Sequence, residues 1–475
     1  MTSASERREL TFTPAYKLAE LIRKKKLSPV ELMEAVVARI EELNPKLNAY
    51  LTVIGDQAIE KAREAEKALS SKSRLGPLHG IPISIKDLHN TKGIRTTMAS
   101  LVFKDFVPDT EGTVVQRLKG AGAIIVGKTN ASEFGLCGSS ENKLGDACRN
   151  PWDTARMAGG SSGGAAAAAA GISPLTQGSD GGGSIRIPCS YCGLFGLKAT
   201  NGRVPKDFAA WGYSHVTSLG PMTRNVRDAA LMMDCIAGPD GLDYTCIRET
   251  PPSFLKALDV KLPKLKIAWS SDLGYGQYGV KVDPEVKRGV ENAARTFAEM
   301  GHNVEEAAPD TGEPFDAWDV SVASRYYIPD GFLLEKHADK IMDYVRLTME
   351  CGRSLTGVEV ARAWIQIEKM RGVMLDFFRK YDLLLTPTTS VPAPIVGQRS
   401  REFGRHFMDH GFWPFTAVFN LTGNPAANVP SGFSATGLPL SLQIVGKLGD
   451  EISVLCASKA FEEARPWAGK YPTVS

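Results

Sequence analysis

The chain has 475 residues, of which 43% are hydrophobic and 23% charged, which is typical of a globular protein with a large core. Its formal net charge of +3 excludes a strongly basic protein dedicated to nucleic acid. No apolar run reaches the roughly 18 residues of a membrane span, and the polar start excludes a signal peptide, so we expect a cytoplasmic protein with no membrane partner.

Hydrophobic periodicity and capping signals predict elements along the whole chain. Helices are expected over 14–26, 28–43, 56–70, 111–119, 226–236, 284–300 and 450–464, and strands over 81–85, 123–126, 193–198, 265–269, 303–307, 383–385 and 440–445. The alternation predicts an α/β fold, with a large mixed twisted sheet covered by helices on both faces. No linker divides the chain, so we expect a single domain over 1–475.

Residues 314–380 read as a mainly helical insertion. On an α/β scaffold such an insertion commonly shapes the mouth of a site. We therefore expect this segment to contact the substrate.

The eight cysteines lack the spacing of a metal site. Cys189 and Cys192 form a C-x-x-C pair, but neither a second pair nor a nearby histidine completes a ligand set. We interpret both as small core residues and expect neither a metal nor another cofactor.

Two glycine–serine segments joined by an alanine run stand out, at 159–164 (GGSSGG) and 180–184 (DGGGS). Glycine N–H groups that end at a serine are what an oxyanion hole beside a nucleophile requires. A flexible linker is the alternative interpretation. Apolar residues such as Ile185 and Tyr191 follow directly, which linkers rarely contain.

Two further motif matches fail on their context. Residues 122–129 fit the Walker A pattern, but its variable positions are themselves a predicted strand, whereas a phosphate loop follows one. Residues 159–163 fit the G-x-S-x-G nucleophile elbow, but 150–156 do not read as the hydrophobic strand that precedes such an elbow. We expect neither nucleotide binding nor an α/β-hydrolase fold.

The glycine–serine segments and several flanking motifs resemble the amidase signature family of serine hydrolases. The motifs, in order, are 80–87 (GIPISIKD), 127–130 (GKTN), 159–164, 180–188 (DGGGSIRIP), 193–198 (GLFGLK), 220–224 (GPMTR), 386–388 (TPT) and 419–423 (FNLTG). They cover most of the chain. The resemblance implies the amidase signature fold, with its signature core at about 75–235, and hydrolysis of a carboxylic amide.

An amide needs an activated nucleophile, a base and donors for the developing oxyanion. The resemblance implies that Ser184 is the nucleophile, that Lys86 is the base, and that Ser161, preceded by a cis peptide bond, relays the proton. Lys86 ends an apolar run, so burial would lower its pKa. Its spacing alone favours an ordinary strand-end lysine that reaches water, and the resemblance reverses this interpretation.

The resemblance also implies roles for residues other than the triad. The amides of Gly181, Gly182, Gly183 and Ser184 are expected to form the oxyanion hole. The alanine run is one residue shorter than is usual in the family, which leaves both Ser161 and Ser162 open as the relay serine. The residues that match the family's supporting positions are Ser162, Asp180 and Arg186.

In the amidotransferase subunits of this family, an aspartate seven residues before the N-x-x-G asparagine holds the glutamine amine. Counting back from Asn420 gives Trp413, so Gly138, Trp413 and Phe415 are candidate lining residues of an apolar or aromatic pocket, with core packing as the alternative. We expect a monomer or homodimer acting on a small-molecule amide, and on carbamates (urethanes) and esters as well. The alternative is a glutaminase-type subunit that feeds ammonia to a partner.

Overall fold

The structure is a computed structural model that describes residues 4–70, 74–206, 215–400 and 410–474. Its centre is an 11-stranded sheet. From one edge to the other the strands are β1 (Tyr50–Val53), β3 (Ile124–Thr129), β2 (Pro82–Lys86), β6 (Leu175–Asp180), β8 (Ser218–Thr223), β7 (Phe195–Lys198), β12 (Ala426–Phe433), β13 (Pro439–Gly446), β11 (Leu383–Pro387), β9 (Lys266–Trp269) and β10 (Asn303–Glu306).

The sheet is mixed, as predicted. Strands β3, β2 and β6 run parallel at one end, and β11, β9 and β10 run parallel at the other. The pairings between β6 and β11 are antiparallel. Strands from the first and second halves of the chain meet where β7 pairs with β12.

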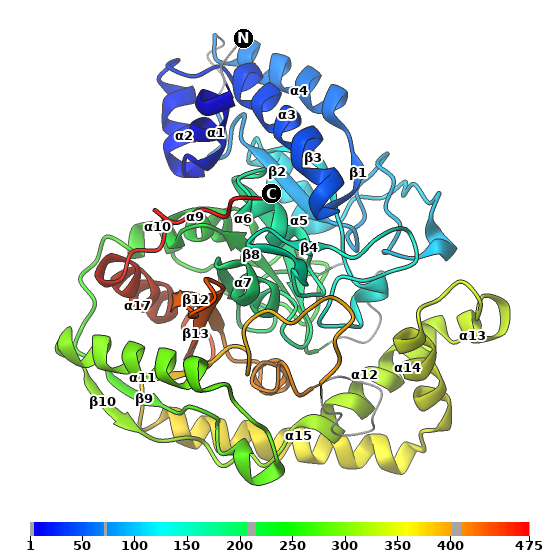
Figure 1. The fold of residues 1–475 in the computed structure, drawn as a ribbon, viewed down its shortest axis with the longest axis vertical. Helices are drawn as coiled ribbons and strands as arrows, with labels where there is room; N and C mark the ends of the chain where they lie inside the picture. Colours follow the sequence, from blue (N-terminus) through cyan, green and yellow to red (C-terminus); the bar gives the residue numbers. More distant parts are fainter. Residues whose placement is uncertain (1–3, 71–73, 207–214, 401–409, 475) are drawn as a thin grey trace.

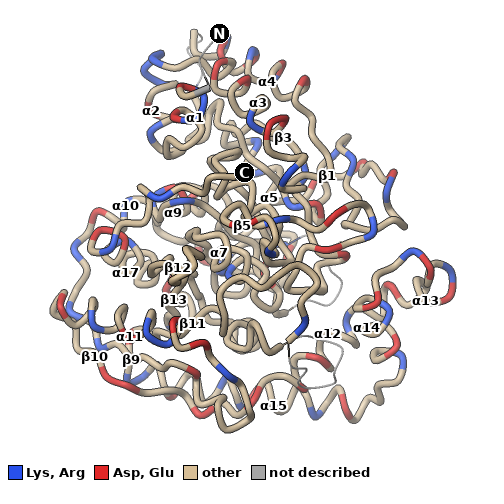
Figure 2. The backbone as a smooth tube through the Cα atoms, in the orientation of Figure 1, with Lys and Arg blue, Asp and Glu red and all other residues tan. Residues whose placement is uncertain are grey.

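Helices surround this sheet (Figure 1). In chain order they are α1 (Ala4–Phe12), α2 (Ala15–Arg23), α3 (Pro29–Leu47), α4 (Gly55–Ala68), α5 (Thr113–Gly120), α6 (Gly164–Ala169), α7 (Arg186–Cys192), α9 (Val226–Ile236), α10 (Phe254–Ala257), α11 (Pro284–Glu299), α12 (Phe315–Asp330), α13 (Phe332–Lys336), α14 (Asp343–Ser354), α15 (Gly357–Phe378), α16 (Ala417–Leu421) and α17 (Glu451–Ala464). Helices α1 to α4 gather at one end of the molecule and α12 to α15 at the opposite side (Figure 1). Charges of both signs are spread along these outer helices (Figure 2).

Both faces of the sheet are buried, which β11 shows within three residues. Leu383 and Leu385 pack in the same apolar cluster as Phe297 of α11. Leu384 packs with Phe377 of α15 in a second cluster. Because side chains alternate along a strand, the two clusters lie on opposite faces.

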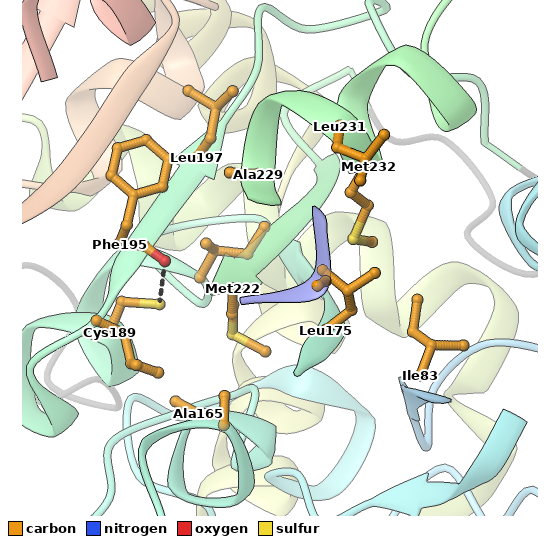
Figure 3. Close-up of a cluster of buried hydrophobic side chains, with 14 of the residues drawn as sticks. Ile83, Ala165, Leu175, Cys189, Phe195, Leu197, Met222, Ala229, Leu231 and Met232 are labelled. Atoms are coloured by element: carbon orange, nitrogen blue, oxygen red, sulfur yellow. Dashed lines mark hydrogen bonds between the residues drawn. The ribbon is translucent and has the colours of Figure 1, made fainter. Parts of the chain in front are cut away.

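The larger cluster joins strands and helices that are distant in the sequence. Figure 3 shows Ile83 of β2, Leu175 of β6 and Met222 of β8 around one apolar centre. Cys189 and Cys192 of α7 are buried thiols, and the Cys189 Sγ lies 3.6 Å from the Phe195 carbonyl oxygen. The predicted core role of this pair is consistent with these positions.

The alanine helix α6 brings the first glycine–serine segment against the sheet. Its residues are fully or almost fully buried. A Cβ added at Gly164 would lie 2.5 Å from the Thr176 Cγ2 of β6, so only glycine allows the helix to pack this closely. This close packing places Ser161 beside the carboxyl end of β6.

The structure shows the context of the Walker A match at 122–129 and of the nucleophile-elbow match at 159–163. Strand β3 covers most of the Walker A match, and the Lys128 amine is buried, donating to the His89 carbonyl and to the hydroxyls of Thr91 and Thr96. A strand does precede the elbow match, β5 (Asp153–Met157), but as expected it is not the hydrophobic strand that an elbow requires. This strand is polar and pairs with β4 (Arg149–Asn150) in a separate two-stranded sheet, so the context of a nucleophile elbow is still absent.

Four strands of the main sheet were not predicted, namely β1, β6, β8 and β12. Their sequences carry glycine, proline or polar residues rather than an alternating apolar pattern. Strands β6, β8 and β12 have hydrogen-bonded neighbours on both sides, and β1 lies at the edge of the sheet, paired with β3. None of the helices within the described ranges has the length and apolar character needed to cross a bilayer.

Candidate active site

A cavity of about 630 Å³, counting its open mouth, lies where β2 and β6 end. Residues of the two glycine–serine segments line it together with aromatic side chains. The lining includes Leu88, Cys137, Gly138, Ser161, Ser179, Gly181, Gly182, Ser184, Ile187, Thr217, Trp318, Val322, Arg325, Tyr326, His410 and Trp413. Both candidate serines, Ser161 and Ser184, therefore face the same space.

Lys86 is the last residue of β2 and is fully buried. Its amine lies 2.7 Å from the Ser161 Oγ, 3.1 Å from the Ser179 Oγ and 3.4 Å from the Ser179 carbonyl oxygen. Burial lowers the pKa of Lys86 to about 7, although the charge of Asp180 opposes the shift. This lysine does not reach bulk water, which removes the strand-end alternative.

Ser161 follows a cis peptide bond from Gly160, as the resemblance implies. The neighbouring Ser162 side chain donates instead to the Ser179 carbonyl, at 3.3 Å. Of the two adjacent hydroxyls, that of Ser161 contacts Lys86.

Ser184 ends the glycine loop between β6 and α7. Asp180 organises this loop, because its carboxylate accepts the N–H groups of Gly183 (2.7 Å) and Ile185 (3.2 Å). The Gly183 N–H is thus directed at Asp180, which removes Gly183 from the predicted oxyanion donors. The amides of Gly181, Gly182 and Ser184 stay as predicted donors.

Two residues from elsewhere in the chain hold the carbonyls of the same loop. The Thr416 hydroxyl donates to the Gly182 carbonyl at 2.6 Å, and the Trp318 indole N–H donates to the Gly181 carbonyl at 3.4 Å. The C=O and N–H of one peptide unit point in opposite directions. The Trp318 contact therefore turns the Gly182 N–H away from the indole, and the Thr416 contact turns the Gly183 N–H towards Asp180.

A buried ion pair supports the loop from below. Arg186 makes two hydrogen bonds of 2.9 Å to the Asp180 carboxylate, and both side chains are fully buried. Arg186 also donates to Gln443 and to Asn420, both at 2.6 Å. Burial alone would raise the pKa of Asp180, but the Arg186 guanidinium outweighs it and holds that pKa well below its usual range.

Of the two aromatic candidates for the substrate pocket, Trp413 lines the cavity and Phe415 does not. Trp413 lines the cavity and packs on Gly138, where an added Cβ would lie 2.5 Å from the indole ring. The prediction that Phe415 lines the pocket was wrong. Phe415 is fully buried in the core and stacks on Tyr275, with ring centroids 6.2 Å apart.

Several lining residues were not foreseen. Trp318, Arg325 and Tyr326 come from α12, within the predicted helical insertion. The Nε2 atom of His410 lies 2.8 Å from the Oδ1 atom of the Asp319 carboxylate, and the two side chains are buried. The helical spacing of 318, 322, 325 and 326 marks one face, but the sequence did not indicate which face meets the cavity.

Known proteins with similar sequences match this chain over nearly its whole length. A family model for amidases matches residues 31–455. The chain belongs to the amidase signature family. This amidase is 37% identical to an acylamidase of Rhodococcus erythropolis, with 98% of each chain covered.

Other relatives of this amidase include one component of the glutamyl-tRNA(Gln) amidotransferase of Geobacter metallireducens, which is 35% identical, with 97% of this chain and 98% of that one covered. Among solved structures, a bacterial aryl acylamidase superposes with a TM-score of 0.87 at 30% identity, covering 96% of this chain and 97% of that one. A 6-aminohexanoate cyclic dimer hydrolase superposes with a TM-score of 0.87 at 29% identity, covering 98% and 99%. The amidase is thus an amide-hydrolysing enzyme.

Proposed function

We propose that this amidase cleaves a carboxylic amide with a triad of Ser184, Ser161 and Lys86, through an acyl-enzyme. The observation that carries the proposal is the contact between the buried Lys86 amine and the Ser161 hydroxyl, at 2.7 Å, beside a cavity that Ser184 also lines. Lys86 contacts Ser161, and because burial lowers the pKa of Lys86 to about 7, this lysine can act as a base near pH 7.

In the first half of the reaction, neutral Lys86 accepts a proton from Ser161 as Ser161 accepts the proton of Ser184. The Ser184 Oγ attacks the amide carbonyl carbon, and the N–H groups of Gly182 and Ser184 bind the oxyanion. Collapse of the tetrahedral intermediate breaks the C–N bond. Ser161 returns the proton to the leaving nitrogen, and Lys86 becomes neutral again.

In the second half, water takes the place of the departed amine. It loses a proton along the same route, attacks the acyl carbonyl and releases the carboxylic acid and Ser184. Because the same nucleophile, base and oxyanion donors can act on the carbonyl of a carbamate or an ester, we include carbamates and esters among the substrates.

The substrate class follows from the apolar side chains that line the cavity. Trp318, Trp413, Leu88 and Ile187 line it. Flat apolar side chains of this kind favour an aromatic or apolar group next to the amide. We therefore propose that the substrate is an apolar or aromatic amide. We also propose that the enzyme acts as a monomer or homodimer.

The second candidate function is that of a glutaminase subunit feeding ammonia to a synthetase, which the 35% identical amidotransferase relative favours. Trp413 stands where those subunits carry the aspartate that holds the glutamine amine, and a neutral indole cannot form that ion pair. Purified chain without any partner should hydrolyse simple arylamides and leave glutamine intact. Glutamine hydrolysis that appears only with a partner would favour the alternative.

Ser184→Ala tests the proposal. We expect at least a thousandfold loss of turnover on an acyl 4-nitroanilide, with the melting temperature unchanged, because a methyl group cannot form the acyl-enzyme. A fluorophosphonate should label Ser184 in the parent enzyme, as read by peptide mass spectrometry. Labelling at Ser161, or more than a few per cent of residual activity, would contradict the assignment.

A further inference from the structure

Helix α12 brings one aromatic side chain against the backbone of the glycine loop that ends at Ser184. Trp318 lies near the start of this helix, is buried and lines the cavity. A Cβ added at Gly182 would lie 2.5 Å from the Cζ2 atom of the Trp318 indole ring. The ring therefore packs directly on the Gly182 backbone, in a contact that only glycine permits.

The indole N–H adds direction to this contact. It donates to the Gly181 carbonyl oxygen at 3.4 Å. The Gly181 carbonyl and the Gly182 N–H belong to one planar peptide unit and point in opposite directions. Because Trp318 holds the carbonyl end of this unit, it also sets the direction of the Gly182 N–H.

The next peptide unit of the loop shows why this direction matters. Its carbonyl, that of Gly182, accepts the Thr416 hydroxyl at 2.6 Å, and its N–H, that of Gly183, donates to Asp180 at 2.7 Å. Both ends of that unit are occupied within the protein. Within the described parts of the chain, no group accepts a hydrogen bond from the Gly182 N–H, and Gly182 lines the cavity. The unit that Trp318 holds thus keeps its N–H available to a ligand.

The indole itself is restrained by His410. The two rings are perpendicular, with their centres 5.4 Å apart. The Nε2 atom of His410 lies 2.8 Å from the Oδ1 atom of Asp319, the residue that follows Trp318 in α12. His410 also packs on Phe315 of the same helix, with ring centres 5.1 Å apart. These contacts hold the indole in one orientation before any substrate binds.

We propose that Trp318 is a positioning residue of the oxyanion hole, which directs the Gly182 N–H at the carbonyl oxygen of the substrate. The inference rests on the proposed hydrolysis at Ser184 and adds a residue from α12 to it. The substrate oxygen gains its negative charge only when Ser184 attacks, so a well-directed donor stabilises the transition state more than the bound substrate. The contribution of Trp318 should therefore appear in kcat, whereas a side chain that only lines the cavity would change KM.

The test removes the indole N–H and keeps an aromatic ring. Trp318→Phe does this, and 3-benzothienylalanine incorporated at position 318 also keeps the bicyclic shape, with sulfur in place of the N–H. On an acyl 4-nitroanilide we expect kcat to fall about tenfold in both, with KM nearly constant. This is less than the roughly hundredfold or greater loss for a deleted donor, because the Gly182 N–H is misdirected but still present.

Trp467→Phe is the matched control. The Trp467 indole N–H also donates to a backbone carbonyl, that of Arg224, at 2.8 Å, and this residue does not line the cavity. It should leave kcat and KM as in the parent enzyme. Melting temperatures verify that each variant is folded, and the benzothienyl variant decides the test if Trp318→Phe is not.

A trapped oxyanion gives a second measurement. Phenethyl trifluoromethyl ketone accepts the Ser184 Oγ at its carbonyl carbon, while the serine proton passes through Ser161 to Lys86, which leaves a hemiketal oxyanion in the hole. The alcohol with the same carbon skeleton cannot react. In both Trp318 variants the inhibition constant of the ketone should rise about tenfold, and that of the alcohol should not change.

The outcomes separate this inference from the proposed function. An active parent enzyme that binds the ketone more tightly than the alcohol, with kcat and ketone affinity unchanged in both Trp318 variants, would keep the reaction and overturn the role of Trp318. A rise in KM alone, or an equal loss in Trp467→Phe, would also overturn it. A parent enzyme that neither hydrolyses the anilide nor distinguishes the ketone from the alcohol would refute the reaction at Ser184 itself.

Discussion

The amine of Lys86 lies 2.7 Å from the hydroxyl of Ser161, and both side chains are buried. The two residues are 75 positions apart in the sequence, one at the end of β2 and the other after β5. Below the pKa of Lys86 the ammonium donates this hydrogen bond. Above it, the neutral amine has a lone pair that can accept the serine proton, so the contact can work as a base only in that range.

The first prediction is therefore a pH profile. Burial lowers the pKa of Lys86 to about 7, so kcat/KM should rise as the pH increases through about 7 and then level off. Lys86→Met should lose nearly all turnover. Lys86→Arg should also be inactive, because a guanidinium keeps its proton throughout this range. A profile that is flat between pH 5.5 and 9 would contradict the role of Lys86.

Lys86→Met should also change the free energy of unfolding, and the direction follows from the pKa of Lys86. The pKa is about 7 in the folded chain and about 10.4 in the unfolded chain. Between these values the unfolded chain binds more protons, so the free energy of unfolding rises with pH. Burying the charged form of Lys86 lowers the free energy of unfolding by up to about 4–5 kcal/mol. This loss of stability is at its full size below about pH 7 and is absent above about pH 10. Chemical denaturation should show Lys86→Met more stable than the parent at pH 6, with the difference shrinking towards pH 10.

A further prediction separates the two adjacent serines. Ser161→Ala removes the hydroxyl that contacts Lys86 and should lower kcat at least a hundredfold. Ser162→Ala removes a bond to the Ser179 carbonyl and should cost far less activity. The pair is a matched control, since both positions are buried and lose one oxygen. Greater loss in Ser162→Ala would reverse the assignment of the relay.

His410 and Asp319 offer a rival base inside the same cavity. If Lys86 is the base, His410→Asn should alter KM more than kcat and leave more than a tenth of the turnover. Asn keeps a polar contact for Asp319, which limits the structural effect. A folded His410→Asn variant with no turnover, beside an active Lys86→Met, would favour a His–Asp pair.

The last prediction concerns Thr416, whose hydroxyl holds the Gly182 carbonyl at 2.6 Å. Thr416→Val keeps the shape and removes this bond, so the glycine loop next to Ser184 loses one restraint. We expect kcat to fall about tenfold with KM nearly constant, because oxyanion donors act in the transition state. Thr436→Val, on an exposed turn, is the control. An increase in KM with kcat unchanged would make Thr416 a binding residue instead.

Local sequence determined the parts of the site that depend on backbone chemistry. A glycine run that ends at Ser184 is recognisable because it needs only its immediate neighbours. The role of Lys86 came from the family resemblance, since its spacing alone favours an ordinary strand-end lysine. Reasoning from local sequence predicted the mixed sheet and most helices. It missed β6, although this strand leads directly to Ser184, because a strand paired on both sides needs no apolar alternation of its own.

Tertiary structure decided the rest. Trp318 and Arg325 line the cavity, and Phe415 lies in the core, because packing determines which face of a segment meets the cavity. The Gly183 amide points at Asp180 because Thr416, more than 230 positions away, turns its peptide unit. Such contacts join ordinary residues across long stretches of chain, and no local pattern encodes a partner that only folding brings within reach.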